Sequence, residues 1–330
     1  MEFSENNVNM FRSWANALHL PINNNFKSLL VHHNKIFELI NSKYKNENSK
    51  KTYLSALAKL FKVLKGSSSY LYRKYSKLSV QLQKQIEHNN LSQEVSERRK
   101  QNYLTFDDVI KKREELKELF LQNPNDPKIN QQYLILCLYT MQPPLRMDYK
   151  DMQIVKAFPH DKTKNYIIKK FDNYHVIINK DKVSNKYKQA VFELSTELSN
   201  IIDESLKYYP RKYILSLVSN PDIAIGNQSF EVLLRGCFDN KRVGVDMLRS
   251  AYITNLYDNK YTTMKDKAEV AHKMRSSIAM ASTVYHKISR KEESDEDLIN
   301  DFVKRIKIQD KDHLKRMVLD IITAIRKSEE

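Results

Sequence analysis

The segment Leu138–Tyr149 reads LYTMQPPLRMDY and carries a proline pair, followed closely by Arg146. Upstream of the prolines, Gln131–Thr140 is an apolar run that predicts a helix. The prolines should stop this helix, because proline has no amide hydrogen and its ring clashes with the preceding turn. Arg146 is therefore expected just beyond the end of an apolar helix.

The sequence changes in character around Asn123–Pro127 (NPNDP), which is the best linker candidate. Helical periodicity dominates before it, and strand-like pieces follow it until helices resume near Ser195. These pieces are Met152–Phe158, Asn165–Lys170, Tyr174–Ile178 and Ala190–Leu194. We therefore expect a mainly α-helical protein with one small antiparallel β-sheet. Its predicted parts are an N-terminal arm (1–22), a helical domain (23–122) and a second domain (123–330).

Several helices can be predicted in more detail. Ser49–Phe61 has apolar residues at every third or fourth position behind a serine cap, and Thr105–Asp108 opens a helix with acids in its first turn. His313–Arg326 is amphipathic and predicts a terminal helix. The chain has only four glycines, which argues against a barrel, a sandwich or a glycine-rich phosphate loop.

The formal net charge of +16 is unusual for a globular protein and indicates a polyanionic partner, most often nucleic acid. A lysine-rich codon bias is the alternative explanation, although it does not explain why acids fail to balance the lysines. Basic residues interleaved with tyrosines can grip phosphates and stack on sugars. The candidates for such DNA contacts are Lys50, Lys51, Arg73 and Lys74.

The cysteine and histidine pattern predicts no metal centre and no cofactor. Cys137 and Cys237 lie in apolar runs and are expected to be buried thiols, and the histidines lack ligand spacing. No apolar run reaches the length of a membrane span. We expect a soluble, intracellular protein without membrane contact.

A second arginine and a tyrosine complete the pattern begun by Arg146. Arg249 lies on a predicted helix, in the step Met-Leu-Arg, and Tyr285 follows in a run of small residues. Two arginines can hold the non-bridging oxygens of one phosphate while a phenol oxygen attacks its phosphorus. The order of these residues is therefore what DNA strand transfer through a phosphotyrosyl bond requires.

The whole arrangement resembles the tyrosine recombinases (phage-type integrases) and, more loosely, the type IB topoisomerases. The resemblance spans essentially the whole chain but is specific only in its second half. Leu138–Tyr149 looks like the first family box of recombinases from large eukaryotic DNA viruses and their mobile elements, and Ser96–Thr105 resembles the start of their domain junction. It implies a DNA-binding helical domain followed by a catalytic domain.

The resemblance also implies roles for individual residues. Arg146 and Arg249 would hold the scissile phosphate, and Tyr285 would form a 3′-phosphotyrosyl intermediate without metal or ATP. Family members protonate the leaving 5′-oxygen with a lysine in a turn of the small sheet. Lys182 is the first choice for that general acid and Lys180 the second.

Two positions depart from the family pattern. Asp246 stands three residues before Arg249, where a histidine or lysine is usual, and Ser276 stands nine residues before Tyr285, where a histidine or tryptophan is usual. Asp246 could orient Arg249, and the Ser276 hydroxyl could still donate one hydrogen bond. His272, one helical turn before Ser276, is a second candidate donor, and a surface or core position is its alternative.

The resemblance implies double-stranded DNA as the partner, assembly as a homodimer or tetramer, and work in a host nucleus or viral replication compartment. Three alternatives stay open at this level. A topoisomerase-like enzyme would nick and reseal one duplex. A degenerate recombinase would bind DNA without cleaving it, and a helical RNA-binding protein would prefer RNA.

Overall fold

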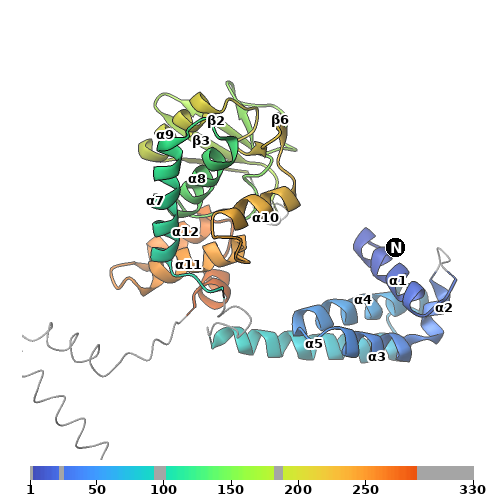
Figure 1. The fold of residues 1–330 in the computed structure, drawn as a ribbon. Coiled ribbons are helices and arrows are strands. Elements are labelled where there is room, and N and C mark those ends of the chain that lie inside the picture. Colours follow the sequence, from blue (N-terminus) through green and yellow to red (C-terminus); the bar gives the residue numbers. More distant parts are fainter. Residues whose placement is uncertain (1–2, 22–25, 93–101, 182–188, 288–330) are drawn as a thin grey trace, which may run out of the picture. The chain divides into compact units, whose positions relative to one another are not determined.

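The computed structural model describes residues 3–21, 26–92, 102–181 and 189–287. The chain divides into two compact units, Met1–Gln93 and Glu94–Glu330 (Figure 1). The first unit is helical, and the second combines helices with a small sheet. The predicted fold class is therefore confirmed at this level.

The first unit consists of helices around one apolar core. Its helices are α1 (Glu5–Ala17), α2 (Lys27–Val31), α3 (His33–Lys43), α4 (Glu47–Lys65) and α5 (Tyr70–Leu91). Phe11 and Trp14 of α1 are buried in the same core as Leu57 and Phe61 of α4. The predicted N-terminal arm is thus part of this core, because the apolar face of α1 needs a surface to cover it.

Local capping explains where α4 begins and ends. The Asn46 side chain accepts hydrogen bonds from the amides of Asn48 and Ser49, so α4 starts at Glu47 and the predicted serine cap is wrong. Gly66 follows the helix with φ +85°, a conformation that favours glycine. Basic residues occupy the last turn of α4, where they complement the helix dipole.

The second unit begins earlier than the predicted linker. Its first described helix is α7 (Phe106–Gln122), which packs on α8 (Pro127–Thr140). Phe120 of α7 stacks on Tyr133 of α8, with ring centroids 5.4 Å apart. The structure therefore places α7 in the second unit, because its apolar stripe completes the core around α8, and Asn123–Pro127 is a helix connection instead of a linker.

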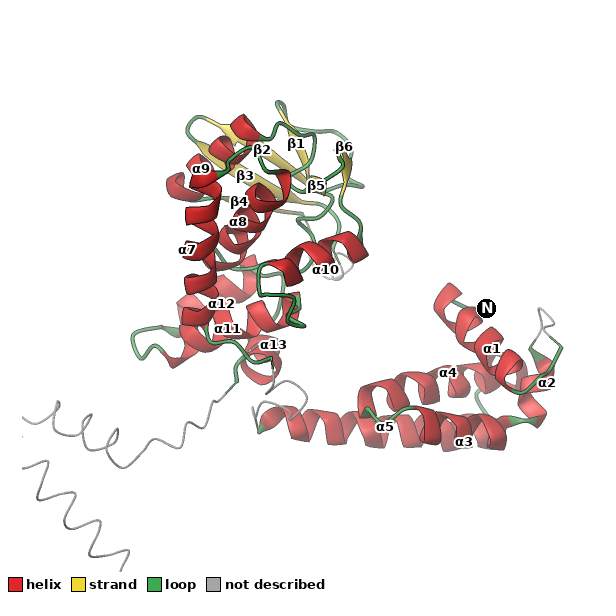
Figure 2. Ribbon diagram, in the orientation of Figure 1, coloured by secondary structure: helices red, strands yellow, loops and turns green. Residues whose placement is uncertain are grey.

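Four strands form the main sheet in the order β1-β2-β3-β4, and α9 (Thr196–Tyr208) packs against it (Figure 2). The strands are β1 (Gln153–Val155), β2 (Tyr166–Lys170), β3 (Asn173–Ile178) and β4 (Ala190–Glu193). β1 pairs with β2 in parallel, whereas the other pairs are antiparallel. The sheet is thus mixed, which corrects the prediction of a purely antiparallel one.

A second, two-stranded sheet lies in a stretch that the sequence predicted as helical. It consists of β5 (Ser216–Leu217) and β6 (Asn220–Ala224), and Gln131 of α8 accepts a hydrogen bond from the amide of Ser216. These strands are too short to show alternation in the sequence. A buried side chain from another helix holds their start in place.

The remaining described helices carry the end of the unit. They are α10 (Asn227–Gly236), α11 (Val245–Asp258), α12 (Met264–Lys273), α13 (Ile278–Met280) and the π-helical turn η1 (Ala281–Tyr285). Cys137 and Cys237 are buried, as predicted. None of the described helices is both long and apolar enough to cross a membrane. The predicted terminal helix, 313–326, lies outside the described residues.

Candidate active site

The C-terminal turn of α12 organises the candidate site. The amide of Ser276 donates to the carbonyl of Ala271 (2.9 Å), and the amide of Arg275 donates to the carbonyl of His272 (3.0 Å). This pair of bonds closes the helix in a Schellman motif, which needs a left-handed residue. Arg275 occupies that position with φ +54°, where a non-glycine residue costs roughly 1–2 kcal/mol.

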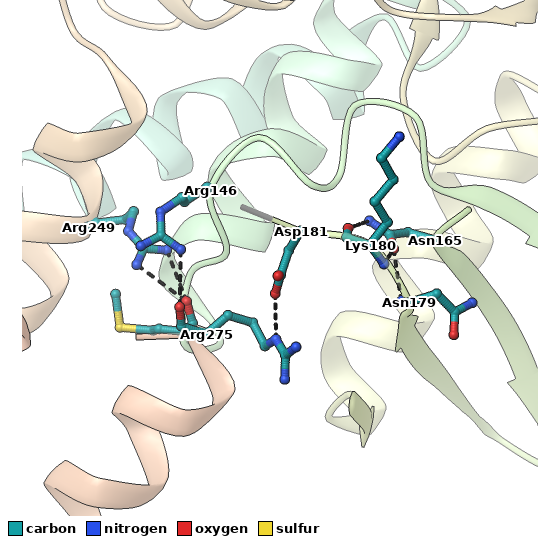
Figure 3. Close-up of polar contacts among 8 residues, drawn as sticks. Arg146, Asn165, Asn179, Lys180, Asp181, Arg249 and Arg275 are labelled. Carbon is teal, nitrogen blue, oxygen red and sulfur yellow. Dashed lines mark hydrogen bonds and ion pairs between the residues drawn. The ribbon is translucent and has the colours of Figure 1, made fainter. Parts of the chain in front are cut away.

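Two consecutive carbonyl groups of this turn hold the two predicted arginines. Both terminal nitrogens of Arg249 donate to the carbonyl of Met274, at 3.4 and 3.3 Å. One terminal nitrogen of Arg146 donates to the next carbonyl, that of Arg275, at 3.1 Å. Figure 3 shows the two guanidinium groups side by side at this turn. The structure therefore brings together two arginines that are far apart in the sequence.

Residues 142–149, which include the proline pair, provide further contacts to these arginines. Arg249 also donates to the carbonyl of Pro144 at 2.6 Å, and the Tyr139 hydroxyl donates to the carbonyl of Arg146 at 2.5 Å. Gln142 donates to the Tyr149 hydroxyl at 2.8 Å. The segment after α8 is thus folded back on itself and fastened to both α8 and α11.

Tyr285 lies directly against Arg249. The Arg249 guanidinium carbon is 4.7 Å from the centre of the Tyr285 ring, and the tyrosine is 5% exposed. Tyr285 ends η1, and π-helical turns occur frequently at functional sites. The chain after it is tied to α11, where His286 bonds Asp258 at 2.9 Å and the Lys287 amide donates to Thr254. The candidate nucleophile and both arginines therefore share one site.

Two buried donors in this region have no acceptor among the described residues. Arg249 is fully buried, yet its Nε has no hydrogen-bond partner, and neither has the hydroxyl of the buried Ser276. None of the ion pairs within the described ranges involves Arg249. Buried donors normally have partners, so an anionic oxygen entering here would find unused hydrogen-bonding capacity.

Acidic groups border the arginines. Burial raises the pKa of Asp148, and the Asp181 carboxylate adds to this rise, while the charge of Arg146 opposes it. Asp181 itself forms a buried ion pair with Arg275, in which Arg275 Nε lies 2.5 Å from an Asp181 oxygen. The region is thus a compact set of alternating charges, not a simple basic pocket.

Arg275 is the site residue that sequence reasoning missed. Its importance comes from a left-handed backbone and from a partner ninety-four positions away. The one available signal was the absence of a glycine after the helix that holds His272, where a C-terminal cap usually has one. That signal could not identify the partner.

The predicted general acid is not located here. Lys182 lies outside the described residues. Lys180 is exposed, and in Figure 3 its side chain extends away from Arg146 and Arg249. The structure therefore does not bring Lys180 to the arginines.

The two remaining second-rank candidates are both exposed side chains. Asp246 is exposed in the first turn of α11, where an acid complements the helix dipole. No hydrogen bond between Asp246 and Arg249 is present. His272 is exposed on α12, which agrees with the surface alternative for this residue.

The candidate DNA contacts fall on α4 and α5 of the first unit. Arg73 and Lys74 are exposed on α5, whereas Lys50 and Lys51 are half-buried on α4. The Lys51 ammonium donates to Gln83 at 2.7 Å, which occupies it within the unit. Arg73 instead lines a hollow of about 480 Å³ together with Tyr72, Ser76, Lys77, Val80, Gln81 and Lys84. This surface of α5 is basic and carries a tyrosine.

No family model matches the chain, and no curated protein matches its sequence. Among solved structures, it is similar to a crystal structure of XerA recombinase, with a TM-score of 0.41 and 14% sequence identity. The match covers 92% of this chain and 99% of that one. The functional interpretation therefore depends on the site itself.

Proposed function

We propose that the protein is a DNA strand transferase that cleaves and rejoins DNA through a covalent bond to Tyr285. The observation that carries this proposal is the convergence of Arg146 and Arg249 on adjacent carbonyls, with Tyr285 packed against one of them. Within the part of the chain that the structure describes, neither arginine forms an ion pair that would hold it at this turn. Guanidinium groups are planar hydrogen-bond forks that match a phosphate better than they match carbonyl oxygens.

The chemistry follows from these groups. The Tyr285 oxygen attacks the phosphorus and gives up its phenol proton to water, the bond from phosphorus to the 5′-oxygen breaks, and a 3′-phosphotyrosyl ester and a 5′-hydroxyl result. The arginines stabilise the negative charge that grows on the non-bridging oxygens in the transition state. Attack by a 5′-hydroxyl reverses the step and releases the tyrosine, so the energy of the phosphodiester is retained. Lys182 is the proposed donor of the proton to the leaving oxygen.

In this proposal, the arrangement of the arginines and Tyr285 is the one that precedes DNA binding. The carbonyl groups of Pro144, Met274 and Arg275 take the places that phosphate oxygens would occupy at the arginines. The Tyr285 ring covers Arg249. Phosphate binding then requires η1 to rearrange, so that the ring leaves the guanidinium and its hydroxyl turns toward the phosphorus.

The partner in this proposal is duplex DNA, contacted by the basic surface of α5 in the first unit. The net charge of the whole chain, +16, supports a polyanionic partner. Strand exchange between two duplexes would need a dimer or tetramer, whereas relaxation of one duplex would need only a monomer. A substrate with two sites separates these cases, because only an exchange reaction gives joint molecules.

The test uses nicked suicide duplexes made from the DNA that flanks the coding sequence, incubated with the full chain in EDTA and without ATP. We expect a covalent protein–DNA band on a denaturing gel that disappears in Tyr285→Phe. Tyr257→Phe is the matched control, because Tyr257 packs against the same small core, whereas the ring that lies 4.7 Å from the Arg249 guanidinium belongs to Tyr285. Its band should persist.

A second function, duplex binding without cleavage, is favoured by one observation. Arg249 is fully buried and Tyr285 nearly so, which leaves both groups closed to a phosphate in this state. This alternative predicts tight, salt-sensitive duplex binding with no covalent band on any flanking sequence. That combination would contradict the proposed strand transfer.

A further inference from the structure

We propose that Arg275 is a positioning residue for the two phosphate-binding arginines, a role that rests on the proposed function. Its side chain pairs with Asp181, and its backbone forms the turn whose carbonyls hold Arg146 and Arg249. The ion pair thereby fixes the turn, and the turn fixes the arginines.

Arg275 has a left-handed backbone conformation at the end of α12. Because φ is +54° at this residue, the chain reverses after α12 and presents the carbonyls of Met274 and Arg275 in succession. The left-handed turn by itself does not tie the end of α12 to the sheet, so an additional contact is needed to hold these carbonyls in place. The Arg275 side chain supplies that contact.

The Arg275 side chain forms a buried and directional ion pair with Asp181. Arg275 Nε lies 2.5 Å from an Asp181 oxygen, and the two side chains are 3% and 1% exposed. Water screens a pair this deeply buried only weakly, so loss of the Arg275 side chain would remove a strong contact of the turn. The pair therefore strongly favours a single arrangement of the turn.

Asp181 can act as an anchor because the chain just before it is clamped. The Asn165 side chain accepts hydrogen bonds from the amides of Asn179 (3.0 Å) and Lys180 (2.9 Å), and it donates to the carbonyl of Lys180 (2.8 Å). Asn165 is buried beside the start of β2, and Asn179 follows the end of β3 (Figure 3). The sheet thus holds Asp181, and Asp181 holds Arg275.

This connection has a specific consequence for the reaction. Loss of the Arg275 side chain leaves both arginines and Tyr285 in the chain, and it leaves the basic surface of the first unit unchanged. Duplex binding should therefore survive. The cleavage step should slow, because the guanidiniums would no longer be held ready for the transition state.

The central variant is Arg275→Gly, because glycine adopts the left-handed conformation freely and only the side chain is lost. We expect duplex affinity within about two-fold of the wild type and a single-turnover cleavage rate at least about ten-fold lower, by analogy with other positioning groups. The exchanged pair Asp181→Arg with Arg275→Asp should recover part of the rate, since aspartate tolerates this conformation. A wild-type cleavage rate in Arg275→Gly would overturn the inference.

A second readout does not depend on activity. Arginine side-chain NMR should show slowed rotation of the Arg249 guanidinium in the wild type, with Arg249→Lys and Arg146→Lys identifying the signals. In Arg275→Gly we expect this rotation to become fast. If the wild type forms no covalent band, the proposed function fails, yet unchanged Arg249 rotation in the variant would still refute the positioning role.

A double variant distinguishes loss of arginine positioning from loss of folding. If Arg275→Gly does not fold because Asp181 is left charged and buried, Arg275→Gly with Asp181→Asn removes that charge. This double variant should fold, bind duplex and show the same fast rotation of Arg249. Slow rotation in the folded double variant would overturn the inference.

Discussion

At the scale of single residues, Arg249 combines a structural and a proposed catalytic role. Its guanidinium joins the carbonyl of Pro144, in the segment after α8, to that of Met274, at the end of α12. Arg146 reaches only one carbonyl and is partly exposed. The two arginines therefore differ in how much of the fold depends on them.

We predict that Arg249→Lys lowers the free energy of unfolding by about 1–3 kcal/mol, because a lysine cannot reproduce the fork and leaves buried carbonyls without a donor. Urea unfolding followed by circular dichroism measures this loss. Arg242→Lys, at an exposed arginine, is the matched control and should be neutral. Equal stability of both variants would contradict the bridging role of Arg249.

At the scale of elements, the contact of α10 with α8 depends on a residue without a side chain. A Cβ atom at Gly236 would lie 2.3 Å from Nε2 of Gln132. That amide is buried and donates to the carbonyl of Leu233 at 3.1 Å. The Gln132 amide can move away only by breaking this hydrogen bond. The two helices can therefore approach closely because position 236 is glycine.

Gly236→Ala should therefore destabilise the second unit by about 1–3 kcal/mol, the usual cost of an overpacked interior. Gly226→Ser is the control: no atom lies within 4 Å of a Cβ there, and serine is a good N-cap for α10. Thermal unfolding should show a lower midpoint for the first variant and an equal or higher one for the second. A neutral Gly236→Ala would show that Gln132 can move without cost.

At the scale of the whole molecule, the two units have separate cores, and tryptophan fluorescence reports on the core of the first unit alone. The chain has a single tryptophan, Trp14, which is buried in the first unit. In the same core, His33 Nδ1 lies 2.7 Å from the Tyr75 hydroxyl. Burial lowers the pKa of His33 below 6.5, and the charge of Lys74 lowers it further.

This shift makes the first unit sensitive to acid. The unfolded chain takes up a proton at His33 below pH 6.5 while the folded chain resists it, so stability falls as the pH drops below that value. Trp14 fluorescence during urea unfolding should show this fall between pH 7 and pH 5.5. In His33→Asn the dependence should be weaker; an identical slope in the variant would assign the effect to other groups.

Local patterns in the sequence predicted the helices and the strands of the main sheet. α8 was predictable because a long apolar run and a proline pair are local signals, and α7 because acids fill its first turn. The pairing of Arg146, Arg249 and Tyr285 was predicted through their order and the family resemblance. The two arginines meet at one turn and Tyr285 packs against Arg249, and their role at a phosphate stays a prediction.

Contacts between distant segments decided the rest. The parallel pairing of β1, the hydrogen bond that holds β5 to Gln131 of α8, and the placement of α7 in the second unit all depend on partners outside the segment itself. The role of Arg275 depends on the exact residue at which α12 ends and on Asp181 lying beside that end. Sequence periodicity reports which face of a segment is apolar, but only the folded chain determines which surface or charge that segment meets.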